Sequence, residues 1–341
     1  MDRQKRIYYW DNLKCVLIFL VVLGHFLIPI KDRGRSLESC YYLIYFFHMP
    51  AFVFVSGFFS KHYIKKGKGA PDTTKILGFL ILYIIYKILL WGISCFFQKG
   101  IVPFHLLEES RAPWYMFAMA VWYIFLPLFS KFKWYISIPM TILMSLYAGT
   151  NDAIGPFLCL SRIIVFFPFF LVGYYFKEEW VQFFVEKKRK IIGGFILAII
   201  ACLVIVNLNR IEMIDQLIYG ERSYAVLPDY ISVTMAMMGR LAFFVIGILM
   251  TLCVMSWIPQ KKLIISYIGS RTLSIYILHR LIREILVQLE IFDKIPFNGV
   301  ELLIFCAIFC SGLTIVLSSN LFHKCFNSVF KIKYDRILES D

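Results

Sequence analysis

The chain has 341 residues, of which 60% are hydrophobic and only 17% carry a charged side chain. Together with a mean hydropathy of +0.73, this composition excludes an ordinary soluble domain and indicates that lipid surrounds most of the chain. The formal net charge of +14 would suggest nucleic-acid binding in a soluble protein, but here basic loops between apolar segments explain it, so we expect no nucleic-acid partner. The nine cysteines show neither a disulfide framework nor a zinc spacing, and we predict no metal.

Ten apolar stretches approach the length of roughly 20 residues that a helix needs to cross the hydrocarbon core of a membrane. The sequence therefore predicts an all-α fold, a polytopic integral membrane helical bundle of about ten transmembrane helices that forms a single transmembrane domain over residues 1–341. The predicted helices lie near residues 13–30, 41–60, 76–97, 114–130, 134–150, 162–176, 191–207, 230–255, 264–289 and 299–322.

The distribution of Lys and Arg between the loops predicts how these helices are oriented. If the N-terminus is cytoplasmic, the inside segments carry 21 of these residues and the outside loops carry 9. Inside loops of membrane proteins carry the excess of positive charge. We therefore expect both termini in the cytoplasm and a multi-pass protein of the plasma membrane.

The first predicted helix opens with polar residues and carries a histidine deep inside. Asp11 and Asn12 are typical of a helix N-terminus. Lys14 fits the headgroup region, where its stem can extend to the surface. His25 lies 12 residues into the helix, roughly 18 Å from the inner end, which places it in the outer half of the membrane.

Two further histidines lie at a comparable depth. His48 is seven residues from the outer end of the second predicted helix, roughly 10 Å down, and His279 is about 15 residues into the ninth, roughly 22 Å up. All three can reach a common level. An imidazole is suited to take a proton from a hydroxyl near neutral pH, so the three are candidate general bases. The alternative is that each histidine only hydrogen-bonds a neighbouring helix.

The loop from Lys61 to Lys75 is basic and rich in glycine. Ammonium groups and backbone amides can bind phosphates. Ordinary inside loops have the same composition, so a purely topological role is the alternative.

Three residues at the outer face are candidates for binding a polar ligand. Arg162, at the start of the sixth predicted helix, can hold a carbonyl, carboxylate or phosphate, or simply pair with Asp152 or a lipid headgroup. Trp114 and Tyr115 open the fourth predicted helix, where aromatic rings stack on sugars or merely mark the interface.

Five segments together resemble the acyltransferase 3 family of membrane acyltransferases, and within it the fucose 4-O-acetylase-like branch. They cover nearly the whole chain in the order expected for the family. The resemblance implies an enzyme that moves an acyl group, usually acetyl from cytoplasmic acetyl-CoA, to carbohydrate on or beyond the outer face. The segments are YYWDNLKCVLIFLVVLGHF, YFFHMPAFVFVSGFF, PWYMFAMAVW, SRIIVFFPFFLVGYYF and SYIGSRTLSIYILH.

The resemblance also implies roles for individual residues. His25 matches the family's first-helix histidine, the candidate catalytic base or acyl carrier, and Lys14 stands where many members carry arginine. Ser56 and Gly57 match a turn that follows the His48 motif. The candidate catalytic residues are His25, His48, His279 and Asp11; those for the donor are Lys14, Lys61, Lys65, Lys66 and Lys75; those for the acceptor are Trp114, Tyr115, Arg162 and Tyr276.

The function expected from the residues and the resemblance is that of a membrane O-acyltransferase acting on a sugar or cell-surface glycan. The expected partners are acetyl-CoA as cosubstrate, a glycan acceptor that is free or lipid-linked, and membrane lipid; a homo-oligomer is left open. One alternative is a transporter or flippase of lipid-linked glycan or acyl groups, because polar residues at mid-depth also line substrate paths. Another is a helical scaffold within a polysaccharide synthesis complex.

Overall fold

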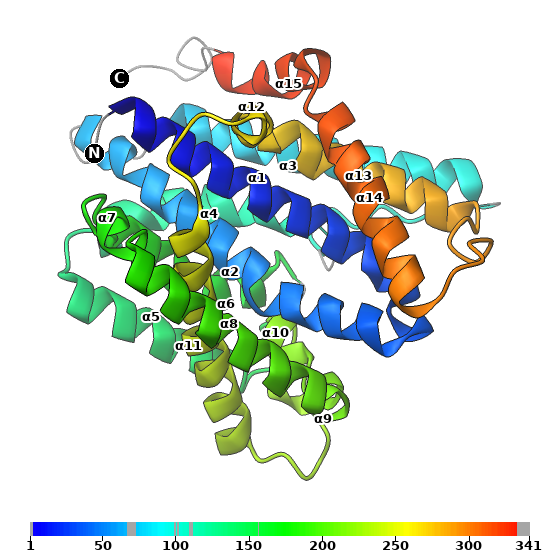
Figure 1. Cartoon of the computed structure of the whole chain (residues 1–341), viewed down its shortest axis with the longest axis horizontal. Helices are drawn as coiled ribbons and strands as arrows, with labels where there is room; N and C mark the ends of the chain where they lie inside the picture. Colours follow the sequence, from blue (N-terminus) through cyan, green and yellow to red (C-terminus); the bar gives the residue numbers. More distant parts are fainter. Residues whose placement is uncertain are drawn as a thin grey trace. The chain divides into compact units, whose positions relative to one another are not determined.

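The computed structural model describes residues 3–66, 73–98, 100, 102–108, 112–155 and 157–332, without the side chains of residues 3–6, 62–66 and 331. Within these ranges the regular elements are helices (Figure 1). The one β-type pairing among them is an isolated bridge between Glu108 and Phe157. The predicted all-α fold is therefore confirmed.

Ten helices of 15 residues or more occupy the described part of the chain, one in each range that the sequence predicts. They are α1 (Arg3–Leu27), α2 (Arg35–Lys66), α3 (Thr73–Phe97), α4 (Trp114–Phe129), α5 (Trp134–Ala148), α6 (Leu160–Tyr175), α8 (Lys187–Val206), α11 (Val233–Trp257), α13 (Thr272–Gln288) and α14 (Gly299–Leu317). The short helices are η1 (Ile28–Arg33), α7 (Trp180–Phe184), α9 (Leu208–Met213), α10 (Gln216–Tyr219), η2 (Tyr224–Val226), α12 (Ile264–Gly269), α15 (Asn320–Asn327) and η3 (Val329–Lys331).

Length and composition identify a polytopic helical membrane protein. Among the described residues, six helices are long and apolar enough to cross a membrane, and three shorter apolar helices, α4, α5 and α6, accompany them. The six lie at Ile7–Arg33, Arg35–Lys61, Thr73–Phe97, Lys187–Val206, Val233–Trp257 and Gly299–Leu317. The total of ten crossings and the cytoplasmic location of both termini stay predictions.

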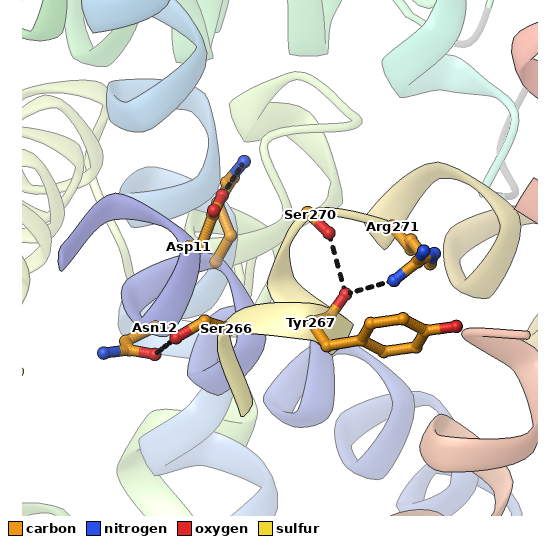
Figure 2. A network of polar contacts seen from close by, with 7 residues as sticks. Asp11, Asn12, Ser266, Tyr267, Ser270 and Arg271 are labelled. Carbon is orange, nitrogen blue, oxygen red and sulfur yellow. Dashed lines mark hydrogen bonds and ion pairs between the residues drawn. The ribbon is translucent and has the colours of Figure 1, made fainter. Parts of the chain in front are cut away.

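The ninth predicted helix is wrong as a single element, because the chain breaks between α12 and α13. The hydroxyl of Ser270 and the guanidinium of Arg271 both donate to the carbonyl oxygen of Tyr267, at 2.8 and 3.2 Å (Figure 2). In an α-helix that carbonyl would accept from the backbone N–H of Arg271. This N–H instead turns to the carbonyl of Ile268, at 2.9 Å. The competing side-chain donors therefore end α12 one turn after it begins.

The chain forms two compact units. The first comprises residues 1–52, 176–215 and 243–323, and the second comprises residues 53–175, 216–242 and 324–341. The prediction of one domain over the whole chain stays a prediction. In the first unit, α1 packs against α12, α13 and α14. The fully buried centre of α1 consists of Leu17, Ile18, Val21 and Val22.

The second unit depends on close helix packing at two glycines. A Cβ atom on Gly57 of α2 would lie 1.9 Å from the carbonyl oxygen of Phe170, and one on Gly173 of α6 would lie 1.9 Å from that of Phe54. Small residues allow membrane helices this close approach. The expected turn at Ser56 and Gly57 is therefore wrong: both residues lie inside α2, where the glycine provides room for α6.

Candidate functional site

His25 of α1 and His279 of α13 form a hydrogen-bonded pair. The Nδ1 atom of His25 lies 3.0 Å from the Nε2 atom of His279, and the ring centroids are 5.1 Å apart. His279 is completely buried, whereas His25 is partly exposed. The expectation that these two histidines reach a common level is confirmed.

The carbonyl of Ile275 determines which nitrogens of this pair carry protons. It lies 2.8 Å from Nδ1 of His279, and because a carbonyl only accepts, that Nδ1 donates. The Nε2 of a neutral His279 is then an acceptor. Nδ1 of His25 therefore donates to it, and Nε2 of His25 keeps a lone pair. The partly exposed member of the pair is thus the one that can accept a proton.

His48 is arranged differently from the other two histidines. Its Nδ1 lies 2.8 Å from the carbonyl oxygen of Ile44, one turn earlier in α2. Its ring packs edge-on against Tyr45, with centroids 4.7 Å apart. His48 is 1% exposed. In the part of the chain that the structure describes, its hydrogen bond is thus to its own helix, and a catalytic role stays a prediction.

The helix α13 carries further polar residues beside His279. Tyr276 is buried, and its ring centroid lies 6.0 Å from that of His279. Arg280 and Arg283 are also buried, with guanidinium nitrogens 3.2 and 3.9 Å from a carboxylate oxygen of Glu284. The sequence analysis assigned no role to these three charged residues. Arg283 and Glu284 follow Arg280 by three and four residues, and this spacing is the signal that could have identified one polar helix face.

At the other end of α1, Asp11 and Asn12 do not form the expected N-terminal cap. The helix begins at Arg3, so both lie well inside it. Asp11 forms an ion pair with Lys14 at 2.8 Å. Fourteen residues separate Asp11 from His25, about 21 Å along the helix axis. The structure therefore does not bring this candidate catalytic residue to the histidine pair.

Asn12 instead forms hydrogen bonds that connect α1 to α12 and to the segment before it. Figure 2 shows the bond to Ser266 of α12. Its Nδ2 donates to the carbonyl oxygens of Pro259 and Lys261, at 2.9 and 3.0 Å. Its Oδ1 accepts from the hydroxyl of Ser266 at 2.7 Å. The backbones are also in contact, since a Cβ on Gly269 would lie 1.7 Å from the carbonyl oxygen of Asp11. The buried amide is thus satisfied by three hydrogen bonds.

The lysines predicted to bind the donor are only partly described. Lys61 Nζ lies 4.6 Å from the ring centroid of Phe58, and Lys75 Nζ lies 4.5 Å from that of Phe330. The side chains of Lys65 and Lys66 lie outside the described residues. A role for these lysines in binding phosphates stays a prediction.

Arg162 and Trp114 are brought together, but Tyr115 is directed elsewhere. The guanidinium of Arg162 lies 5.5 Å from the Trp114 ring centroid and 2.7 Å from a carboxylate oxygen of Glu221. Pairing of Arg162 with Asp152 stays an untested alternative. The Tyr115 hydroxyl hydrogen-bonds that of Ser56. Trp114 and Tyr115 are 6% and 5% exposed, and their acceptor roles stay predictions.

Metal-ligating side chains do not cluster in the described residues. No group of three or more His, Cys, Asp or Glu side chains there could hold a metal ion.

In comparison with known proteins, a family model matches most of this chain, and a known protein matches half of it. The model of the acyltransferase 3 family, described as an acyltransferase domain, matches residues 7–320. The nodulation protein NolL of Sinorhizobium fredii (strain NBRC 101917 / NGR234) is 27% identical over 187 residues, which cover 50% of this chain and 48% of that protein. The match thus spans about half the length of this relative. No solved structure matches the chain.

Proposed function

Because the chain belongs to the acyltransferase 3 family and is a membrane acyltransferase, we propose that it transfers an acetyl group from cytoplasmic acetyl-CoA to a hydroxyl of a sugar or cell-surface glycan. The observation that supports this most directly is the hydrogen bond from His25 to His279, which leaves a proton acceptor at Nε2 of His25. We place the enzyme in the plasma membrane, and its membership of the fucose 4-O-acetylase-like branch remains part of the proposal.

In the proposed reaction, His25 Nε2 takes the proton of the acceptor hydroxyl while the hydroxyl oxygen attacks the thioester carbonyl carbon. The carbon–sulfur bond then breaks, and the proton on Nε2 passes to the departing sulfur. The products are the O-acetyl ester and the free thiol of CoA. As His25 becomes positively charged, its hydrogen bond to His279 becomes charge-assisted and stronger. His279 thus acts as a positioning residue that also stabilises the cationic intermediate state of His25.

The donor would bind along α1, with its phosphates near Lys14; a role for the lysines at 61, 65, 66 and 75 in binding phosphates stays a prediction. Lys14 and His25 are 11 residues apart, which places them about 16 Å from one another and about 20° apart around the helix. They therefore share one helix face. The residues between them, Leu17, Ile18, Val21 and Val22, are fully buried. The acetyl group of the donor can reach His25 along this face only after the segments that cover these four buried residues move aside.

The test is acceptor-dependent release of CoA by the purified full chain in lipid nanodiscs. We expect free thiol to appear from acetyl-CoA when glycan is present and to fall to background in His25→Ala. The matched control is His105→Ala, which removes an exposed histidine. Mass spectrometry of the glycan product should show the added acetyl ester. In sealed proteoliposomes, glycan movement across the bilayer without any thiol release would contradict the proposal and favour the transporter.

A further inference from the structure

Three rings on one face of α2 form a continuous row within the first unit. Tyr41, Tyr45 and His48 are spaced at i, i+4 and i+7, which places them on the same side of a helix. The ring centroids of Tyr41 and Tyr45 are 4.2 Å apart, and those of Tyr45 and His48 are 4.7 Å apart. Tyr41 and His48 are 4% and 1% exposed, but Tyr45 is partly exposed. Tyr45 is thus the ring of the row that a ligand can reach.

Gly24 lets the Tyr45 ring pack against α1, at the residue that precedes His25. A Cβ on Gly24 would lie 3.1 Å from a methyl carbon of Ile44 and 3.3 Å from a ring carbon of Tyr45. Gly24 directly precedes His25, which is also partly exposed. An apolar ring face on α2, packed one residue away from His25 in the α1 sequence, suits a sugar, because a sugar ring offers C–H groups on its face and hydroxyls at its edge.

At the far end of the row, carboxylates surround a lysine. Lys31 Nζ lies 5.6 Å from the ring centroid of Tyr41, 3.6 Å from a carboxylate oxygen of Asp32 and 3.7 Å from one of Glu212. Glu38 interacts electrostatically with Lys31, Asp32 and Glu212, and also with Arg35. Ionised carboxylates accept hydrogen bonds from hydroxyls. The end of the row distant from His48 is therefore rich in acceptors for sugar hydroxyls.

A buried hydroxyl also faces these carboxylates. Tyr42 is completely buried, and its hydroxyl has no hydrogen-bond partner among the described residues. The hydroxyl interacts electrostatically with Asp215, Glu212, Glu38 and Asp32. A buried polar group without a partner is costly. A ligand hydroxyl in this position would remove that cost.

We propose that the surface from Glu38 and Glu212 to Tyr45 binds the acceptor, and that the acceptor is an uncharged oligosaccharide. This inference rests on the proposed function, since it places a sugar hydroxyl at His25. Glu38 and Tyr45 are seven residues apart, about 10 Å along α2, which suits more than one sugar ring. Four carboxylates meet two basic side chains here, Lys31 and Arg35, so the anionic groups of acidic sugars would be repelled.

The experiment compares matched neutral and uronic-acid oligosaccharides as acceptors for the full chain in nanodiscs. We expect Tyr45→Ala to raise the acceptor KM about tenfold, the effect of losing one good aromatic contact, with the KM for acetyl-CoA unchanged. Tyr45→Phe keeps the ring and should recover most of the affinity. Tyr147→Ala, which removes an exposed tyrosine of α5, is the matched control.

A charge-removing variant tests the sugar class separately. Glu38→Gln combined with Glu212→Gln should raise the rate with the uronic-acid acceptor relative to the neutral one. An acceptor KM unchanged in Tyr45→Ala, or a wild-type preference for the acidic sugar, would overturn this inference while leaving acyl transfer intact. Absence of thiol release with either acceptor in the wild type would instead overturn the proposed function itself.

Discussion

At the scale of single residues, the hydrogen bond between His25 and His279 controls which nitrogen of His25 is basic. His279 can accept from His25 only because its own Nδ1 donates to the Ile275 carbonyl. Without that acceptor, the His25 ring is free to rotate and to adopt the other tautomer. His279 should therefore influence the rate without contributing the base.

We expect His279→Ala to lower kcat for acyl transfer, but less than His25→Ala, which removes the base and should cost roughly 10²- to 10⁴-fold. His279→Gln should fall between the wild type and His279→Ala, because its amide oxygen can accept the hydrogen bond from Nδ1 of His25. The measurement is kcat from CoA release, and the KM for acetyl-CoA reports whether each variant still binds the donor. A wild-type kcat in His279→Ala would exclude a positioning role.

The depth of the histidines in the membrane could be predicted from the sequence, but the hydrogen-bond partners of the polar side chains could not. A fixed rise per residue is enough to bring His25 and His279 to a similar level. Which way a side chain points depends on neighbours that are distant in sequence. His48, at a comparable predicted depth, bonds to Ile44 of its own helix. Arg162 likewise pairs with Glu221, and the apolar segment around Arg162 does not indicate this partner.

At the scale of elements, the contact between α1 and α12 sets the position of the helix that carries His279. Asn12 binds the segment before α12 through three hydrogen bonds, and Gly269 packs directly on the backbone at Asp11. Three residues later, at Thr272, α13 begins, and His279 is its eighth residue. A shift of α12 along α1 would therefore be transmitted to the histidine pair.

We expect Asn12→Asp to weaken this contact with little change in side-chain shape. The carboxylate cannot donate to the carbonyls of Pro259 and Lys261, so these two partly buried acceptors lose their donor and face a negative charge. The loss of stability should be about 2–4 kcal/mol, visible as a lower melting temperature in detergent. Asn207→Asp is the matched control, because its amide donates to the carbonyl of Leu203 at the exposed end of α8.

The same variant should lower kcat through His279. If Asn12 acts by positioning α13, Asn12→Asp should reduce kcat in the wild-type background and have little further effect in His279→Ala. Equal reductions in both backgrounds would mean that Asn12 contributes stability only.

At the scale of the whole molecule, apolar length was sufficient to predict where the long helices lie. The break between α12 and α13 was missed because Ser270 and Arg271 compete for a backbone carbonyl within an otherwise periodic stretch. Hydropathy is an average over many residues, so it does not detect a competition at a single carbonyl. It likewise does not detect the close contacts at Gly57 and Gly173 between α2 and α6. The acyltransferase motifs could be recognised from sequence, whereas the row from Tyr41 to His48 depends on ring positions that no motif contains.

The helix α13 decides the topology, and among the described residues it belongs neither to the six helices long and apolar enough to cross a membrane nor to the three shorter apolar helices. It has 17 residues and carries Arg280, Arg283 and Glu284 in buried positions, which a membrane helix tolerates when they face protein and pair with one another. We expect α13 to cross the membrane, and therefore protease-cleavable tags placed at residues 258–263 and 290–298 to lie on opposite sides. In sealed inside-out vesicles, the first tag should be cut and the second protected, with the opposite result in right-side-out vesicles. Cleavage of both tags from one side would show that α13 does not cross, which would place the following segments on the side opposite to the one predicted.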